Sequence, residues 1–332
     1  MIDPSLPLAD LHHHLDGSIR LETILDLGLS HNLPLPAFTL EGLRPFVQVS
    51  TPQPGVMAFI QKFEWMTGVL VDYDACRRVA YENIEDAANE GIDYIELRYS
   101  PWFMAEAHGL KAVGVVEAVS DGVQAGQRVF GVRANQIGIL SRHYGPEIAW
   151  QELAALMSQK EAFAGLDLAG DEANYPGDLF VEHFKKARDI GWHITVHAGE
   201  AAGAASIWQA LRGLGAERIG HAVRAAEDPA LLDYLFEHRI GLECNLTSNV
   251  QTTTVPDYVH HPMRAFIEKG LLATLNTDDP GISAINLHYE YEVAAPKAGL
   301  TNEMIRQAQL NAMTIAFLSQ TEIDVLRQKK QD

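Results

Sequence analysis

The sequence lacks most marks of a secreted, membrane-spanning or disulfide-bonded protein. Its 332 residues include only two cysteines, Cys76 and Cys244, and neither belongs to a C-x-x-C pair. This usage indicates a reduced, cytoplasmic setting rather than a disulfide framework. No apolar run approaches the roughly 18 residues of a membrane-spanning helix. The first four residues, 1–4, also lack the basic and then apolar pattern of a secretion signal.

Basic residues are scarce as well, since 25 Lys and Arg stand against 44 Asp and Glu and give a net charge of −19. Such a chain repels phosphate backbones, which argues against a nucleic acid or an anionic membrane as a partner. The acidic residues are spread along the chain without forming a tail, so the charge is most simply a solubility feature. We also expect a substrate that is not highly anionic.

Several catalytic signatures are missing. The sequence contains no G-x-x-x-x-G-K-[ST] phosphate loop, no H-E-x-x-H zinc motif and no G-x-S-x-G nucleophile turn. The P-C-x-x-C signature of the small cytidine-type zinc deaminases is also absent. No low-complexity tract or linker rich in Pro and Gly divides the chain, so we expect a single domain over residues 1–332.

What the sequence does contain is a histidine cluster near its N-terminus, at His12, His13 and His14. The preceding run LPLADL (6–11) is typical of a short buried strand, in which side chains alternate between two faces. His12 and His14 would then share a face and could bind one metal ion, for which zinc is the best match to neutral imidazole. The alternative is a solvated cluster or a tag remnant, but the apolar flanks speak against a tag.

A recurring unit, a short β-type run followed by an amphipathic helix, predicts the fold class. From the third run onward the spacing is about 24–31 residues, which suits one strand and one crossover helix. Eight such units predict an α/β protein with a (β/α)8 barrel of the TIM type. An open doubly wound sheet is the alternative, but it would not bring the first strand beside the eighth. The expected strands lie at 6–12, 93–99, 134–140, 163–168, 192–197, 218–221, 240–245 and 271–276, and the expected helices between them include 177–190, 203–214, 228–238 and 257–269.

The barrel should carry additions at both ends of the chain. About 80 residues separate the first two expected strands, far more than one crossover needs. Helical periodicity over 19–31, 55–70 and 73–90 predicts a helical insertion at about 19–90, interrupted by a segment rich in Pro and Gly at 33–55. Such an excursion commonly builds a lid or a pocket wall. The tail at 286–328 predicts helices that pack on the outside.

Polar side chains fall where the expected strands end, which is where barrel enzymes carry their active sites. Barrel closure brings Asp278 near His12 and His14, and the narrow interior lets His197 reach across to the same ion. Three histidines and one carboxylate are a plausible zinc set with room for a water. The strand ends also carry Asp171, Glu172, Glu200, His221 and Asp279.

Each of these residues also has a structural interpretation when it is taken alone. His197 and His221 could be core histidines, Asp278 and Asp279 could cap a helix before Pro280, and the 171–172 pair could belong to a solvated loop. The functional interpretation rests on all of them falling on one face. The fourth expected strand, LDLAG (166–170), has no lysine that could bridge two ions, so we expect one metal rather than two.

With these motifs established, the chain closely resembles the adenosine deaminase family, of the amidohydrolase-like barrel group. The matching stretches span the whole chain in the family's order, and HLDG, VHAGE and TDDP together are very specific. They are HHHLDG (12–17), LDLAGDE (166–172), TVHAGE (195–200), RIGHA (218–222), LTSN (246–249) and NTDDP (276–280). Two positions depart from the usual pattern: Ala222 replaces a common Gly, and Cys244 lies one place earlier than in many members.

The resemblance implies a role for each matching residue. One zinc ion per chain would be bound by His12, His14, His197 and Asp278. Glu200 would transfer a proton, and His221 and Asp278 would take part in catalysis. The implied substrate contacts come from His14, Asp16, Gly170 and Asp279. A purine nucleoside would be the only partner, with no nucleic acid and no membrane, and the sequence does not give the oligomeric state.

The implied reaction is the hydrolytic deamination of adenosine and 2′-deoxyadenosine to inosine and deoxyinosine, a step of purine salvage. Zinc lowers the pKa of a bound water from 15.7 to roughly 7, and His221 could hold this water and accept its proton. Glu200 could protonate ring N1 if burial keeps it neutral. The Gly170 amide could donate to N3, and Asp279 could serve N7 only if it is protonated.

Two alternatives remain open at this point. One is a sister deaminase that acts on adenine or another 6-aminopurine derivative, and the other is a zinc-bearing barrel that binds nucleosides without turnover. Sister adenine deaminases tend to carry HLEG where this chain has HLDG, and the shorter Asp16 leaves space for a ribose and could accept a hydrogen bond from it. The alternative for Asp16 is that it only caps the turn at Gly17.

Overall fold

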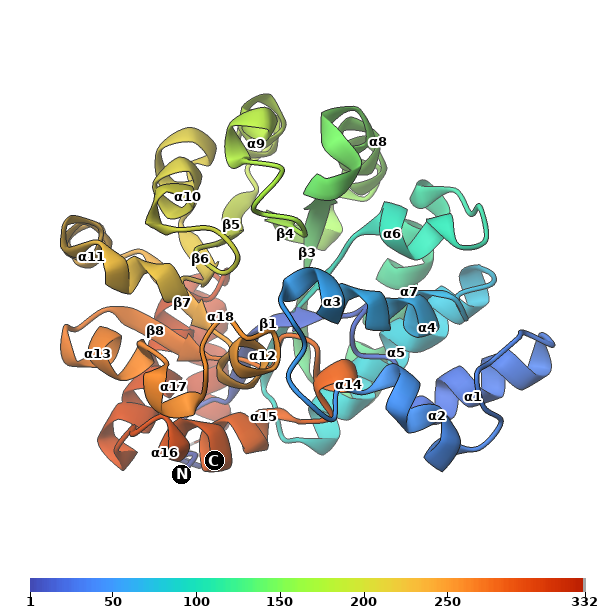
Figure 1. The fold of residues 1–332 in the computed structure, drawn as a ribbon, viewed down its shortest axis with the longest axis horizontal. Coiled ribbons are helices and arrows are strands. Elements are labelled where there is room, and N and C mark those ends of the chain that lie inside the picture. The colour runs from blue at the N-terminus through green and yellow to red at the C-terminus, as the bar shows by residue number, and fades with distance from the viewer. Residues whose placement is uncertain (331–332) are drawn as a thin grey trace.

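The computed structural model describes residues 1–330 and contains eight parallel strands that form a barrel wrapped by helices (Figure 1). Each strand pairs with the next one in chain order. The ring closes where the His14 N–H donates to the Asp278 carbonyl (2.7 Å) and the Asp278 N–H donates to the His12 carbonyl (2.8 Å). The predicted barrel is therefore confirmed. The strands are β1 (Ala9–His14), β2 (Tyr94–Tyr99), β3 (Arg133–Ser141), β4 (Phe163–Ala169), β5 (His193–Ala198), β6 (Arg218–His221), β7 (Gly241–Cys244) and β8 (Leu272–Leu275).

All eight expected strands exist, and β1 is the one whose position differs most. It was expected at 6–12 but runs over Ala9–His14, because its closure bonds to Asp278 extend the strand through His14. Its register against β2 shifts between Asp10 and His13. All three histidines therefore lie on the strand itself rather than in the loop that follows.

Helices after each strand form the outer ring of the barrel (Figure 1). The helix expected at 257–269 is in fact two pieces, because Pro262 forces the preceding residue, His261, into an extended conformation (ψ 130°). The ring helices are α6 (Pro101–Glu106), α7 (Ala112–Phe130), α8 (Gly145–Met157), α9 (Val181–Asp189), α10 (Ala204–Gln209) with a π-turn at Ala210–Leu214, α11 (Pro229–Glu237) and α13 (Met263–Glu268), whereas α12 (Leu246–Gln251) lies near the centre of Figure 1. Short 3-10 turns lie at Arg142–Tyr144, Lys160–Ala162, Gly177–Phe180, Val223–Glu227 and Tyr258–His260.

The long connection between β1 and β2 contains five α-helices. They are α1 (Leu21–Ser30), α2 (Leu40–Val47), α3 (Val56–Ile60), α4 (Glu64–Thr67), which follows a 3-10 turn at Gln61–Phe63, and α5 (Tyr73–Asn89). The last of them, α5, packs along α7 in the outer ring, whereas α3 lies across the mouth of the barrel (Figure 1). The helix α2 was not expected within the segment at 33–55; Thr39 caps it by accepting a hydrogen bond from the Gly42 N–H (3.1 Å).

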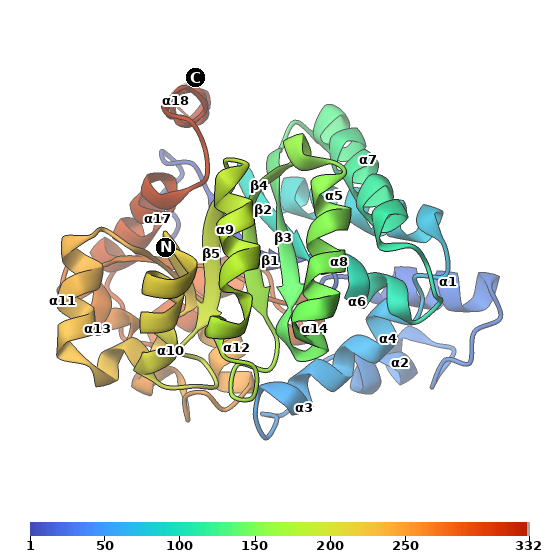
Figure 2. The ribbon, with the colours of Figure 1, turned by 90° about the horizontal axis from the view of Figure 1, so that it is seen from above.

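The C-terminal segment after β8 is helical, as expected. Its elements are α14 (Pro280–Ser283), α15 (Leu287–Tyr289), a π-turn at Glu290–Ala294, α16 (Ala295–Lys297), α17 (Asn302–Ile315) and α18 (Gln320–Lys329). Side chains of α17 and α18 pack on Ala9, Leu11 and Tyr94, at the start of β1 and β2. Figure 2 shows α18 and α3 at opposite ends of the molecule. Within residues 1–330, no helix combines the length and the apolar character needed to cross a bilayer.

Candidate metal centre and catalytic pocket

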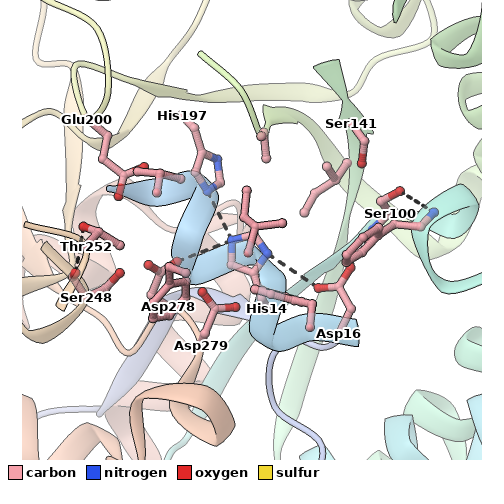
Figure 3. A pocket seen from close by; sticks show the side chains of 18 of the residues that line it. His14, Asp16, Ser100, Ser141, His197, Glu200, Ser248, Thr252, Asp278 and Asp279 are labelled. Carbon is pink, nitrogen blue, oxygen red and sulfur yellow. Dashed lines mark hydrogen bonds and ion pairs between the residues drawn. The ribbon is translucent and has the colours of Figure 1, made fainter. Parts of the chain in front are cut away.

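Three histidines from opposite sides of the barrel converge on one carboxylate at the C-terminal ends of the strands. The Nε2 atom of His197, on β5, lies 3.1 Å from both His12 Nε2 and His14 Nε2, on β1. Asp278 Oδ1 lies 3.0 Å from His12 Nε2 and 3.4 Å from His14 Nε2. Figure 3 shows His14 linked in this way to His197 and to Asp278. Strand alternation holds, since His13 points away and contacts Asn83 on α5 (3.0 Å).

The outer nitrogens of two of these rings determine what the inner ones can do. His12 Nδ1 lies 2.7 Å from Glu243 Oε2, and His197 Nδ1 lies 2.9 Å from Asp167 Oδ2. A carboxylate only accepts, so each neutral ring carries its hydrogen on Nδ1 and turns the lone pair of Nε2 inward. One cation placed between the ring nitrogens and the carboxylate, which lie 3.0–3.4 Å apart, would satisfy all of these atoms together.

The donor set fits a tetrahedral metal ion. Ligand atoms at about 2.0–2.1 Å from zinc in a tetrahedron are about 3.3 Å apart, and the separations here are 3.0–3.4 Å. All four side chains are buried. A fourth histidine, His221, is close as well: its Nε2 lies 3.9 Å from Asp278 Oδ2. The site could therefore hold a metal.

Charged residues inside the barrel hold the two supporting carboxylates in place. Arg98 donates to Asp167 and to Glu243, at 2.8 Å in each case, and is itself fully buried. Arg218 pairs with the other oxygen of Glu243 (2.7 Å) and with Glu96. Burial alone would raise the pKa of Glu243, but Arg98 and Arg218 hold that pKa well below its usual range. Both carboxylates are therefore ionised and keep His12 and His197 in the metal-binding tautomer.

Glu200 follows β5 by two residues and lies at the edge of the centre. Burial raises its pKa well above the usual range, and the charges of Asp278 and Glu172 act in the same direction. Near neutral pH, Glu200 is therefore a neutral acid that can donate a proton.

Glu172, in the loop after β4, anchors the segment that carries Glu200. Its carboxylate accepts four consecutive backbone N–H groups, from residues 199 to 202, at 2.6–3.1 Å, and the hydroxyl of Ser206. Its neighbour Asp171 instead caps a local turn by accepting from the Asn174 N–H (3.1 Å). Asp171 therefore only caps a turn in its loop, whereas Glu172 supports the site by holding the segment that carries Glu200.

His221 ends β6 in a strained conformation. Both His221 (φ +64°) and Ala222 (φ +57°) occupy the left-handed region, which costs about 1–2 kcal/mol for a residue with a side chain. Gly220 before them is required by space, because a Cβ there would lie 2.9 Å from His12 Cε1. The strained turn directs His221 toward Asp278 and Glu200, whose Oε1 lies 3.6 Å from His221 Nδ1.

A pocket that is partly open to solvent lies beside the metal centre. The long connection supplies an apolar wall through Val56, Phe59, Ile60 and Phe63. Figure 3 shows Asp16, Ser100 and Ser141 on one side of His14, and Glu200, Ser248 and Thr252 on the other. Gly170, at the end of β4, also lines the pocket.

Two pocket carboxylates each have an oxygen that makes no hydrogen bond within residues 1–330. Asp16 Oδ2 accepts the Ser100 N–H (3.2 Å), whereas Asp16 Oδ1 makes no hydrogen bond and lies 3.7 Å from His14 Nδ1 (Figure 3). Asp279 Oδ1 likewise makes no hydrogen bond. Burial and the adjacent charge of Asp278 raise the pKa of Asp279 well above its usual range. Asp279 can therefore donate, as its expected contact with N7 requires. Gly17 makes room for it, since a Cβ there would lie 1.9 Å from Asp279 Oδ1.

The structure thus brings together every residue proposed for the site. The sequence-based reasoning missed the residues that support them, namely Glu96, Arg98, Asp167, Arg218, Glu243, Asn245, Asn249 and His261. Five of them could have been found, because charged residues within buried parallel strands need partners. These five are Glu96, Arg98, Asp167, Arg218 and Glu243. The amides and His261 lie in loops or on short helices and carried no such signal.

Comparison with known proteins identifies relatives over the full length of the chain. The family model described as adenosine deaminase matches residues 7–331. An adenosine deaminase from Edwardsiella ictaluri is 59% identical over 331 residues, covering 100% of this chain and 99% of that protein. One from Vibrio cholerae is 58% identical over 329 residues, covering 99% and 98%.

Solved structures share the fold at lower identity. An adenine deaminase from Arthrobacter aurescens superposes with a TM-score of 0.91 at 24% identity and covers 98% of each chain. An amidohydrolase from Burkholderia ambifaria with bound Zn gives a TM-score of 0.86 at 25% identity, covering 99% of this chain and 93% of the other.

Proposed function

The chain belongs to the adenosine deaminase family and is a hydrolytic deaminase, and we propose that it converts adenosine and 2′-deoxyadenosine to inosine and deoxyinosine with one zinc ion. The observation that carries the proposal is the convergence of three imidazole Nε2 atoms and Asp278 on one point, beside the neutral acid Glu200. We further propose that the protein acts in cytoplasmic purine salvage, where its two buried cysteines would stay reduced.

His12, His14, His197 and Asp278 are the proposed zinc ligands. Their donor atoms, their burial and their spacing suit zinc, and the amidohydrolase from Burkholderia ambifaria was solved with zinc bound. When bound, zinc supplies a water that ionises near neutral pH, with a pKa of about 7 rather than 15.7.

Residues that line the pocket beside the metal site bind the purine ring and transfer protons to it. Glu200 donates its proton to ring N1, where electron density gathers as C6 is attacked. Asp279 donates to N7, and the Gly170 amide donates to N3. His221 Nε2 lies 3.9 Å from Asp278 Oδ2, and it would contact the water that bound zinc supplies.

The charges of the pocket support a nucleoside rather than a nucleotide as substrate. Within residues 1–330, the pocket lining includes four carboxyl groups, those of Asp16, Glu200, Asp278 and Asp279, and no Lys or Arg. A 5′-phosphate would find no Lys or Arg side chain in this lining to pair with. The free oxygen of Asp16 can instead accept a hydrogen bond from a ribose hydroxyl.

A substrate panel tests this proposal. Ultraviolet assays with adenosine, 2′-deoxyadenosine, adenine and adenosine 5′-phosphate should give the highest kcat/KM values for the two nucleosides. Elemental analysis should find about one zinc per chain, and His197→Ala should lose both metal and activity. A preference for free adenine would instead assign the chain to the sister activity, and full activity after thorough removal of metal would exclude the zinc mechanism.

A further inference from the structure

A chain of buried hydrogen bonds ends on the outer nitrogen of His221. Two amide groups reach His221 Nδ1: that of Asn249, on α12, at 2.9 Å, and that of Asn245 at 3.3 Å. Oxygen and nitrogen of an amide are nearly indistinguishable in shape, so the direction of these bonds must be derived from their other partners. All three residues are buried.

The direction of these hydrogen bonds follows from the backbone N–H of Met263, which lies at the end of the chain of bonds opposite His221. The Met263 N–H donates to Nδ1 of His261 (3.2 Å), and a backbone N–H can only donate. Neutral His261 therefore carries its hydrogen on Nε2, which lies 3.1 Å from Asn249 Oδ1. Burial lowers the pKa of His261 to about 3, so the ring is neutral. The other end of the Asn249 amide is consequently its NH2 group, which donates to His221 Nδ1.

We propose that His261 and Asn249 are positioning residues that hold neutral His221 with its hydrogen on Nε2, so that His221 donates a hydrogen bond into the pocket and cannot accept a proton there. The proposal rests on the proposed function only for the identity of the group that receives this bond. It replaces the expectation from the sequence that His221 accepts the proton of the attacking water.

The surroundings of His221 agree with a donor at Nε2. That atom faces Asp278 Oδ2 (3.9 Å), which can only accept when ionised. The nearest other titratable group, Glu200, lies toward Nδ1 at 3.6 Å and is neutral, so it does not require a hydrogen on Nδ1. The rings of His12 and His197 lie 5.1 Å from that of His221, centroid to centroid, and their nitrogens instead contact Glu243, Asp167 and one another.

Nitrogen-15 NMR of the zinc-loaded, histidine-labelled protein tests the tautomer directly. The His221 signals, assigned by their loss in His221→Asn, should show an unprotonated Nδ1 and a protonated Nε2. Asn249→Asp replaces the donor by an acceptor of the same shape and should transfer the hydrogen to Nδ1. A protonated Nδ1 in the parent protein, or an unchanged tautomer in Asn249→Asp, would overturn the proposal.

Kinetics separate positioning from general structural damage. Asn249→Asp should lower kcat for adenosine by about tenfold or more, with little change in KM and with zinc retained. His261→Gln keeps a donor toward Asn249 and should retain most activity, whereas His261→Phe removes that donor and should not. Asn311, buried on α17, donates its amide hydrogen to the Ala273 carbonyl (2.9 Å) and does not touch His221, so Asn311→Asp controls for the cost of a new buried carboxylate.

The two proposals fail in different ways. If the parent protein does not deaminate adenosine, the proposed function fails while the NMR result stands by itself. If Asn249→Asp does not fold, the tautomer of the parent still decides. Equal losses of kcat in His261→Gln and His261→Phe would mean that the relay has only a structural role.

Discussion

At the scale of single residues, a substitution of Glu200 should affect proton transfer without affecting metal binding. It is not among the converging ligand atoms, and its raised pKa keeps it protonated. Glu200→Gln should therefore keep about one zinc per chain and still bind purine ribonucleoside, but should lose several orders of magnitude in kcat, because an amide cannot release a proton to N1. Steady-state kinetics with metal analysis tests this, and loss of zinc in the variant would contradict the role assigned to Glu200.

Asp16 is the residue expected to recognise the sugar. Its Oδ2 accepts the Ser100 N–H, and its Oδ1 lies 3.7 Å from His14 Nδ1 and makes no hydrogen bond within residues 1–330. Asp16→Ala should reduce kcat/KM for adenosine by about 1–3 kcal/mol, the usual cost of an unpaired buried polar group. Zinc content should not change. A 5′-deoxyadenosine or adenine substrate should be affected less, and an equal loss on adenine would argue against a ribose contact.

At the scale of elements, the loop between β5 and α10 depends on one carboxylate. Four backbone N–H groups of residues 199–202 lose their acceptor in Glu172→Ala. We expect a loss of about 1–3 kcal/mol in the free energy of unfolding, together with a lower kcat because Glu200 is no longer held. Urea unfolding and kinetics measure the two effects. Asp171→Ala should change stability by no more than about 0.5 kcal/mol, and similar values for the two variants would show that the anchor is unimportant.

The elements that could be predicted from the sequence are those with a strong local signal. The eight strands were recognisable because buried parallel strands are continuous apolar runs bounded by turns, and the ligands because they end such runs. The helix α2 was missed because Pro and Gly at 33–55 outweighed its short apolar pattern. The helix expected at 257–269 is divided in two because Pro262 disfavours helical backbone at His261, a local effect that the apolar pattern of the segment does not reveal.

Polar contacts between residues far apart in the sequence were harder to predict than the strands. That Glu243 supports His12 across the barrel depends on which strands lie side by side, which no local pattern contains. Ala222 is a further case: the departure from Gly was visible, but its left-handed φ of +57° was not. The strain of about 1–2 kcal/mol is partly offset by its buried methyl group, worth about 0.8 kcal/mol.

At the scale of the whole molecule, the barrel interior joins the metal centre to the opposite end of the fold. Arg98 connects the carboxylates behind His12 and His197, and Arg218 extends the network to Glu96. Glu96 in turn accepts from the Phe317 N–H (2.8 Å), beyond α17. Each charge in this network has an opposite partner, so the buried ions are mutually compensated. The C-terminal helices thereby help to fix the residues that orient the metal ligands.

Stability of the whole chain should decline as pH rises from about 4.5 to about 8, because the buried carboxyl group of Glu290 must then ionise. Burial raises the pKa of Glu290 from 4.5 to about 8, and within residues 1–330 its Oε2 has no hydrogen-bond partner. Between these two pH values the folded state binds one proton more than the unfolded state. Its free energy of unfolding therefore falls as pH rises, by up to about 1.4 kcal/mol per pH unit. Below pH 4.5 the contribution is fully present, and above about pH 8 it is lost.

Glu290→Gln isolates this contribution. The amide keeps an acceptor for the Thr247 N–H and cannot ionise, so the variant should match the parent near pH 5 and become progressively more stable than the parent up to pH 8.5. Urea unfolding of both zinc-loaded proteins at several pH values measures the difference. Glu292→Gln, half exposed on the same turn, should show no such pH-dependent gain. If the difference between Glu290→Gln and the parent is the same at pH 5 and pH 8.5, Glu290 is ionised throughout and the buried carboxyl is not the origin of alkaline instability.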